Sequence, residues 1–165
     1  MKKASLAAVL IFILIQVVAV VSGCGGETPV GMEEELVRYT IENILIPREQ
    51  GTDFIVEWRR RSTGPGDVDP KQLAQGFWKW EGGTLTEINA EEYYQLAAVW
   101  EDEDPNRWVY SQHSITVVEL DERELEAQVE IDSLYNPLSG SGIRYWLRKE
   151  EEEWKKVSEN TEWVS

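Results

Sequence analysis

Cysteine and histidine are almost absent from this chain of 165 residues, which contains Cys24 and His113 and no other residue of either type. A single thiol cannot form a disulfide within the chain, so the fold depends on its hydrophobic core alone. Zinc sites in proteins combine several Cys, His and acidic ligands, and neither Cys nor His is clustered here. We therefore predict no metal site and no bound cofactor.

Basic residues are also scarce, because 16 Lys and Arg stand against 31 Asp and Glu and give a formal net charge of −15. A surface of this charge repels the phosphates of nucleic acids and the headgroups of anionic lipids. The composition argues against nucleic acid as a partner and against a domain that lies flat on a membrane.

Long apolar runs are missing except near the start of the chain, where residues 4–21 are apolar apart from Ser5 and Gln16. Lys2 and Lys3 precede this run and small residues follow it, a layout typical of a secretory signal. A run of this length also just suffices to span a bilayer as an uncleaved helix. In either case the charges at its start predict that the following residues lie on the extracytoplasmic side.

The segment Val21-Ser22-Gly23-Cys24 at the end of this run resembles the lipobox of bacterial lipoproteins. The resemblance implies that Cys24 receives a diacylglyceryl group, that the chain is cleaved before Cys24, and that the new amino terminus is acylated, for example with palmitate. Two or three acyl chains anchor a protein stably in a membrane, whereas one does not. An incidental cysteine after a plain signal peptide and a free reactive thiol are the alternatives.

These features divide the chain into a predicted lipoprotein signal peptide over residues 1–23, a lipidated tether over 24–31 and a single domain over 32–165. The tether is short and rich in glycine, so it is expected to hold the domain close to a membrane of the bacterial cell envelope. Cleavage removes two lysines and leaves 142 residues with 14 basic and 31 acidic side chains, a net charge of −17. We expect the acylated Cys24 to anchor this chain in membrane lipid.

Three segments of the domain have helical features. Apolar residues between positions 32 and 45 form a stripe at helical spacing, which Pro47 ends or kinks. Residues 54–61 are expected to form a short second helix. Their β-branched side chains make a strand the alternative. Residues 89–100 begin with a capping box in which Asn89 is the N-cap, and they predict a further helix.

The last third of the chain changes to a period of two residues. Apolar and polar side chains alternate over residues 125–135, which predicts a strand with one wet face. Further strands are expected over 107–120, 143–149 and 154–164, with a loop at 136–142. Four consecutive strands joined by short connections predict an antiparallel meander. Helices followed by a sheet indicate the α+β class.

This order of elements is similar to that of the nuclear transport factor 2-like group, also called cystatin-like or SnoaL-like. The Gly-Asp-aromatic turn at 51–54 and the closing hairpin at 145–150 and 153–157 carry the resemblance. It implies that residues 32–165 form a cone in which N-terminal helices pack on a curved antiparallel sheet, with a pocket between the helices and the sheet. Some members of the group are isomerases or dehydratases that use an Asp with Tyr or His, and others have no activity.

Few side chains on the predicted strands are suited to catalysis. His113 is a candidate general base, and Asp132 is a candidate catalytic carboxylate. Tyr135 and Tyr145 lie on neighbouring strands and are candidate pocket residues. Asp132 falls on the polar face of its strand, which counts against a buried catalytic role.

Tryptophan is abundant, with eight in the chain. Most are expected in the core, but Trp78 and Trp80 face the same way if residues 78–80 are extended, and we expect them to form an exposed contact surface. The Ser/Gly stretch at 138–142 is a second candidate surface. The sequence thus predicts a lipid-anchored, non-catalytic domain that binds an envelope protein or a small ligand. The alternative is a small pocket enzyme of isomerase, dehydratase or hydrolase type that uses Asp132 or His113 with a nearby tyrosine.

Overall fold

The computed structural model describes residues 30–61, 74–100, 108–121 and 123–165. Residues 31–165 form one compact unit. The predicted signal peptide, Cys24 and most of the predicted tether lie outside the described residues. In the described part of the chain, no helix combines the length and the apolar character needed to cross a membrane.

The unit begins with one helical segment made of α2 (Val30–Thr40), a π-helical turn η1 (Ile41–Leu45) and a short α3 (Ile46–Arg48). The predicted helix with Pro47 near its end is confirmed. The N–H of Ile46 donates to the carbonyl of Ile41, five residues earlier. This wide turn lies directly before Pro47, whose ring clashes with the carbonyl four residues back in an ordinary α-helix. The helix therefore continues as far as Arg48.

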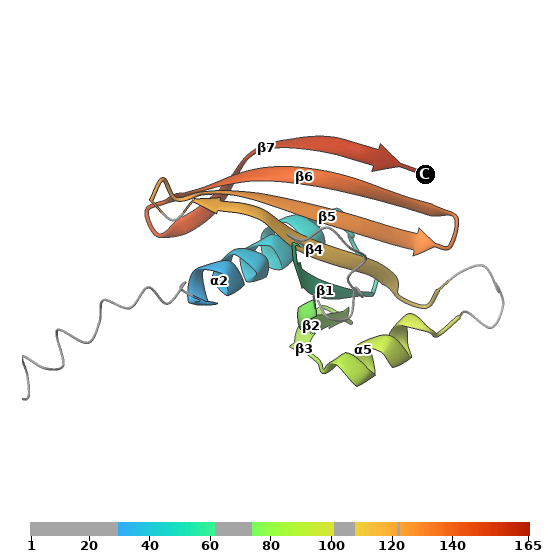
Figure 1. Cartoon of the computed structure of the whole chain (residues 1–165). Coiled ribbons are helices and arrows are strands. Elements are labelled where there is room, and N and C mark those ends of the chain that lie inside the picture. The colour runs from blue at the N-terminus through green and yellow to red at the C-terminus, as the bar shows by residue number, and fades with distance from the viewer. Residues whose placement is uncertain (1–29, 62–73, 101–107, 122) are drawn as a thin grey trace, which may run out of the picture. The chain divides into compact units, whose positions relative to one another are not determined.

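The strands form one mixed sheet, which is seven-stranded over the described residues and has the order β3-β2-β1-β4-β5-β6-β7 (Figure 1). Only the pair of β1 and β4 is parallel among the described strand pairs, and the other pairs are antiparallel. The strands are β1 (Phe54–Arg60), β2 (Ala74–Glu81), β3 (Thr84–Glu87), β4 (Ser111–Asp121), β5 (Glu126–Asn136), β6 (Ser139–Glu150) and β7 (Glu153–Val164).

The predicted fold class, N-terminal helices packed on a curved antiparallel sheet, is wrong. The described part of the molecule is dominated by a large mixed sheet, with one long helical segment and the short helix α5 (Ala90–Ala97). Three strands, β1 to β3, precede the predicted meander, and β1 joins the meander through its parallel pairing with β4. A parallel pair between distant segments leaves no local signal in the sequence, which is why the pattern did not reveal it.

The second predicted helix is also wrong, because residues 54–60 form strand β1. Phe54, Val56 and Trp58 are buried in one hydrophobic cluster, whereas Ile55 is buried in another. The apolar run Phe54-Ile55-Val56 at the start of β1 is buried on both faces, so it cannot be told from a short helix by periodicity. The alternative that the β-branched residues favoured, a strand, is correct.

The predicted meander of four antiparallel strands is confirmed in β4 to β7. The loop expected at 136–142 is shorter, because β6 begins at Ser139 and pairs Gly140 with Leu134 and Gly142 with Asp132. The two glycines therefore lie inside a strand.

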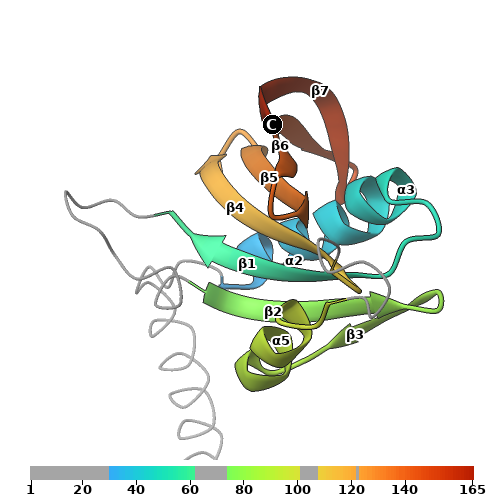
Figure 2. The same cartoon turned by 90° about the vertical axis from the view of Figure 1, so that its right-hand side faces the viewer.

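Alternation along the strands gives the sheet two faces. The inner face, which carries Val56, Ile115 and Ile131, shares its hydrophobic cluster with the helical residues Leu36 and Ile41. The outer face carries Ile55, which packs with residues of α5 in a second cluster. In Figure 2, α2 and α5 accordingly lie on opposite sides of β1 and β2.

The predicted N-cap residue of α5, Asn89, is confirmed. The side chain of Asn89 accepts a hydrogen bond from the backbone N–H of Glu92, with an N···O distance of 3.0 Å. This contact fixes α5 next to the outer face, where Tyr93 is buried.

Candidate functional site

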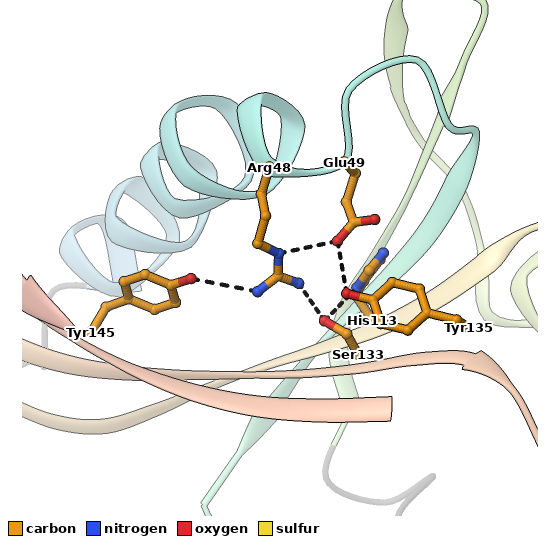
Figure 3. A network of polar contacts seen from close by, with 6 residues as sticks. All are labelled: Arg48, Glu49, His113, Ser133, Tyr135 and Tyr145. Atoms are coloured by element: carbon orange, nitrogen blue, oxygen red, sulfur yellow. Dashed lines mark hydrogen bonds and ion pairs between the residues drawn. The ribbon is translucent and has the colours of Figure 1, made fainter. Parts of the chain in front are cut away.

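The helical segment ends in a polar cluster that we call the Arg48 network, drawn in Figure 3. The guanidinium group of Arg48 donates to Glu49 at 3.0 Å, to the hydroxyl of Tyr145 at 3.4 Å and to the hydroxyl of Ser133. Arg48 therefore joins the end of α3 to strands β5 and β6. Arginine suits this role because its guanidinium carries several N–H donors in one rigid plane.

The same network contains three residues that the sequence predicted for the site. Nδ1 of His113 lies 2.9 Å from Oγ of Ser133, and the hydroxyl of Tyr135 donates to Glu49 at 3.3 Å. Tyr145 completes the set through its contact with Arg48. The structure thus brings His113, Tyr135 and Tyr145 together around an arginine that the sequence did not single out.

The electrostatics of the network keep His113 neutral. Burial, reinforced by the positive charge of Arg48, lowers the pKa of His113 to about 3. The pKa of Arg48 is raised although burial opposes its charge, because Tyr145, Tyr135 and Glu49 stabilise the guanidinium. Arg48 donates to Ser133, so the Ser133 hydroxyl is free to donate its proton to Nδ1 of His113.

A serine next to a histidine resembles the start of a nucleophilic dyad, but here both side chains are buried. Ser133 is 0% exposed and His113 is 1% exposed. Nε2 of His113 has no hydrogen-bond partner among the described residues, whereas a catalytic base is normally oriented by a third group there. The inner face around the pair is filled by large side chains, including Leu36, Trp58 and Trp154. The network therefore holds the helix to the sheet.

The two tryptophans predicted to form a contact surface lie on the inner side of β2. Trp78 is 5% exposed and belongs to the core, which is incompatible with the predicted exposure. Trp80 is partly buried against the same core, and its ring stacks on Phe54 with centroids 6.4 Å apart. Both rings lie on the same side of β2, as expected, but that side faces the core.

The outer face carries an open pocket of about 340 Å³, which we call the outer-face pocket. Glu57, Ser114, Asp132, Gly142 and Trp163 occupy one cross-strand row, since each is the register partner of the next from β1 through β4, β5 and β6 to β7. All members of this row except Gly142 line the pocket. The remaining lining residues are Arg59, Tyr93, Gln112, His113, Glu130 and Leu134.

The indole of Trp163 occupies a defined position in this row. A Cβ atom at Gly142 would lie 2.1 Å from Nε1 of Trp163, and one at Gly140 would lie 3.1 Å from the far edge of the indole. The indole therefore lies across two glycines of β6. Its Nε1 donates to Oδ1 of Asp132 at 3.1 Å, which fixes the ring in its plane. Trp163 is 37% exposed, so part of the ring remains open to solvent.

Glu57 and Arg59 lie at the opposite end of the pocket, two residues apart on β1. The Glu57 side chain is 4% exposed and its Oε1 accepts from Arg59. Oε2 of Glu57 and Nε of Arg59 are buried, and neither has a hydrogen-bond partner within the described part of the chain. A buried unpaired acceptor and a buried unpaired donor side by side are energetically unfavourable unless a ligand or solvent pairs with them.

The centre of the pocket is acidic. Burial raises the pKa of Asp132, and the negative charge of Glu130 adds to this effect, whereas the hydrogen bond from Trp163 opposes it. Glu130 itself is paired with Arg144 at 3.0 Å. Burial, and then the charge of Glu57, raises the pKa of Tyr93, so its hydroxyl stays protonated. The sequence prediction that Asp132 lies on the polar face of its strand agrees with this position.

Sequence reasoning missed most residues of the outer-face pocket. The signal available for Glu57 was a charged residue in the middle of the apolar stretch 54–58. The signal available for Trp163 was weaker, because its partners Gly140 and Gly142 become visible only when β6 is recognised as a strand. Leu138, in the second predicted contact surface, is 85% exposed and lies beyond this pocket.

The described residues contain no group of three or more His, Cys, Asp or Glu side chains placed to hold a metal ion. Comparisons of the chain with models of protein families, with curated proteins and with solved structures give no match. The function is therefore argued from the site itself.

Proposed function

We propose that this protein is a non-catalytic binding domain, anchored to a bacterial envelope membrane through acylated Cys24, that binds a small ligand in the outer-face pocket on the extracytoplasmic side. The lipobox-like segment at 21–24 supports the anchor. The observation that carries the binding role is the half-paired Glu57, a buried carboxylate that lines an open pocket with one oxygen unpaired.

Catalysis by His113 or Asp132 with a nearby tyrosine finds less support. His113 and Ser133 are sealed in the Arg48 network, and the side chain of Asp132 is bonded to Trp163 on the other face of the sheet. Among the described residues no carboxylate hydrogen-bonds to His113, so a general base with an orienting acid is missing there. Binding needs none of these groups to transfer a proton.

The anchor is tested with a Cys24→Ser variant in cells fed labelled palmitate. We expect the wild-type chain to be labelled and cleaved, and the variant to remain an unlabelled precursor. Normal labelling and processing of the variant would refute the anchor.

The binding role is tested with the purified full-length chain in detergent and an aqueous small-molecule extract of the bacterial envelope. A ligand at tenfold excess over its Kd stabilises a domain of this size by about 1.4 kcal/mol, or roughly 5 °C in Tm. We expect this shift for the wild type and for Trp100→Ala, an exposed tryptophan outside the pocket, and its loss in Trp163→Ala. Equal shifts in all three proteins, or none in the wild type, would refute binding at this pocket.

A further inference from the structure

The unpaired groups of the outer-face pocket describe the chemistry of its ligand. Oε2 of Glu57 needs a donor, and Nε–H of Arg59 needs an acceptor. Both residues are on β1 and point to the same face, but Oε2 and Nε are themselves buried, so one ligand group meets both only when the 35% exposed side chain of Arg59 moves aside. A hydroxyl does so, because it donates its proton to the carboxylate and accepts a hydrogen bond from the guanidinium.

The charges and unpaired groups of the pocket disfavour the simpler ligand classes. An anion would meet three carboxylates, those of Glu57, Glu130 and Asp132. A simple ammonium ion would be attracted by these carboxylates, but it has no acceptor for the Nε–H of Arg59 and would leave that donor unpaired. A purely apolar ligand would bury the two unpaired groups more deeply without satisfying either one. A neutral ligand with several hydroxyl groups avoids all three penalties.

The far end of the pocket provides an apolar surface. The indole of Trp163 lies across Gly140 and Gly142 and is held by Asp132, so its position does not depend on the ligand. Leu134, which is 42% exposed, lines the pocket beside it. A rigid aromatic ring presents a large contact area with little loss of conformational entropy, and the C–H groups of a sugar ring can pack against it.

From this arrangement we propose that the outer-face pocket binds neutral saccharide units, with ligand hydroxyls between Glu57 and Arg59 and the C–H face of a sugar ring on Trp163. The volume of about 340 Å³ is at the lower end of small-molecule sites, which indicates a mono- or disaccharide portion as the bound part. This inference rests on the proposed binding function, whose pocket it shares.

The test uses the full-length chain in a detergent without a sugar headgroup. Chitotriose and maltotriose are the neutral probes, putrescine is the cationic probe, and glucuronate is the anionic probe. Binding is measured by calorimetry and by the ¹H–¹⁵N signal of the Trp163 indole, which is assigned with Trp163→Phe. We expect at least one neutral saccharide to bind and shift this signal, and neither charged probe to do so.

Two variants connect binding to the groups named above. Glu57→Gln removes the charge of the acceptor, and Arg59→Lys removes the Nε donor, so each is expected to weaken saccharide binding at least tenfold. Glu126→Gln and Arg148→Lys make the same changes in an ion pair that lines a different cavity, and they should bind like the wild type. Thermal unfolding shows whether each variant is folded. If one pocket variant does not fold, the other is compared with its control.

The outcomes separate the two proposals. Putrescine or glucuronate binding that depends on Glu57 and Arg59, without saccharide binding, would overturn the ligand class and leave the binding role intact. Saccharide binding of equal strength in the pocket variants and their controls would also overturn the inference. Absence of binding by every probe would overturn it as well, while the envelope extract and Trp163→Ala decide the binding role separately.

Discussion

At the scale of single residues, His113 makes the stability of the fold depend on pH. Its pKa is about 3 in the folded protein, against an ordinary value of 6.5, because burial and Arg48 disfavour its charged form. Between these two values the unfolded chain binds more protons than the folded one, so stability is complete above pH 6.5 and is lost as the pH falls toward 3.

The prediction is a loss of up to about 1.4 kcal/mol per pH unit in this window that is absent from a His113→Gln variant. Urea unfolding of both proteins between pH 7 and pH 4 measures the difference. Carboxylates such as Asp132 titrate in both proteins and cancel in the comparison. Parallel curves for the two proteins would show that His113 titrates normally in the folded state.

Gly142 is the second residue whose role can be isolated. An added Cβ atom would approach Nε1 of Trp163 to 2.1 Å and Oδ1 of Asp132 to 2.8 Å, so the indole must move. We expect Gly142→Ala to lower the free energy of unfolding by roughly 1–3 kcal/mol and to shift the Trp163 indole signal. Gly31→Ala is the matched control, since a Cβ there meets nothing within 4 Å. If Gly142→Ala left both the free energy of unfolding and the Trp163 indole signal unchanged, the position of Trp163 against Gly142 would be contradicted.

At the scale of elements, the turn between β6 and β7 departs from the rules for its type. Glu151 and Glu152 form a two-residue hairpin loop with φ values of 51° and 70°. A positive φ at both positions is the geometry of a turn that favours Asn-Gly, and it is strained for other residues. The β2–β3 hairpin has Gly82 and Gly83 at the corresponding positions.

Replacing the loop by Glu151→Asn with Glu152→Gly is therefore expected to raise the free energy of unfolding by about 1–2 kcal/mol. Urea unfolding at pH 7 provides the measurement. The control, Glu151→Gln with Glu152→Gln, removes the same two charges without changing the backbone preference and should stabilise much less. If the control stabilised equally, relief of charge repulsion rather than backbone conformation would be the cause.

The elements differ in how much of them the sequence could predict. The helix over 32–45, the Asn89 cap and the meander have local signals, namely periodicity, a capping residue and short turns, and the structure contains all three. The start of strand β1 has no such signal because Phe54, Ile55 and Val56 are buried on both faces, and its partner β4 begins about fifty residues later. The predicted fold class was wrong because β1 was predicted as a helix and β2 and β3 were not predicted.

The candidate site divides in the same way. His113, Tyr135 and Tyr145 stood out as chemically distinctive residues on predicted strands, and they do meet. Their partner Arg48 depends on where the helix ends after Pro47, which the sequence left open between an end and a kink. The outer-face pocket depends on the register that aligns Glu57 with Asp132 and Trp163 across five strands, and register between distant strands is a tertiary property.

At the scale of the whole molecule, the sheet separates two kinds of polar site. The members of the Arg48 network bond to one another, so the network fixes the helical segment to the strands. The outer-face pocket is open and leaves Glu57 and Arg59 partly unpaired. Groups that are satisfied internally stabilise a fold, whereas groups left unpaired beside an open pocket are available to a ligand.

The large excess of acidic residues also acts on the whole molecule. Ion pairs on the surface are worth about 0–1 kcal/mol each, and several here are more than one third exposed, such as Arg38–Glu42 and Lys155–Glu150. Repulsion, in contrast, acts among all the acidic side chains, which outnumber the basic ones by 31 to 16. Because compact packing brings these charges closer than they are in the unfolded chain, screening them should favour the folded state.

We therefore expect an increase from 20 to 300 mM NaCl to stabilise the protein by about 1 kcal/mol, or roughly 3 °C in Tm, as measured by thermal unfolding at pH 7. A variant with Glu→Gln changes at the exposed positions Glu124, Glu151, Glu152 and Glu153 should start from a higher Tm at low salt and respond less to NaCl. A Tm that falls with salt would mean that the ion pairs outweigh the repulsion. The variant distinguishes the two cases, because it removes negative charge without removing any of the ion pairs named above.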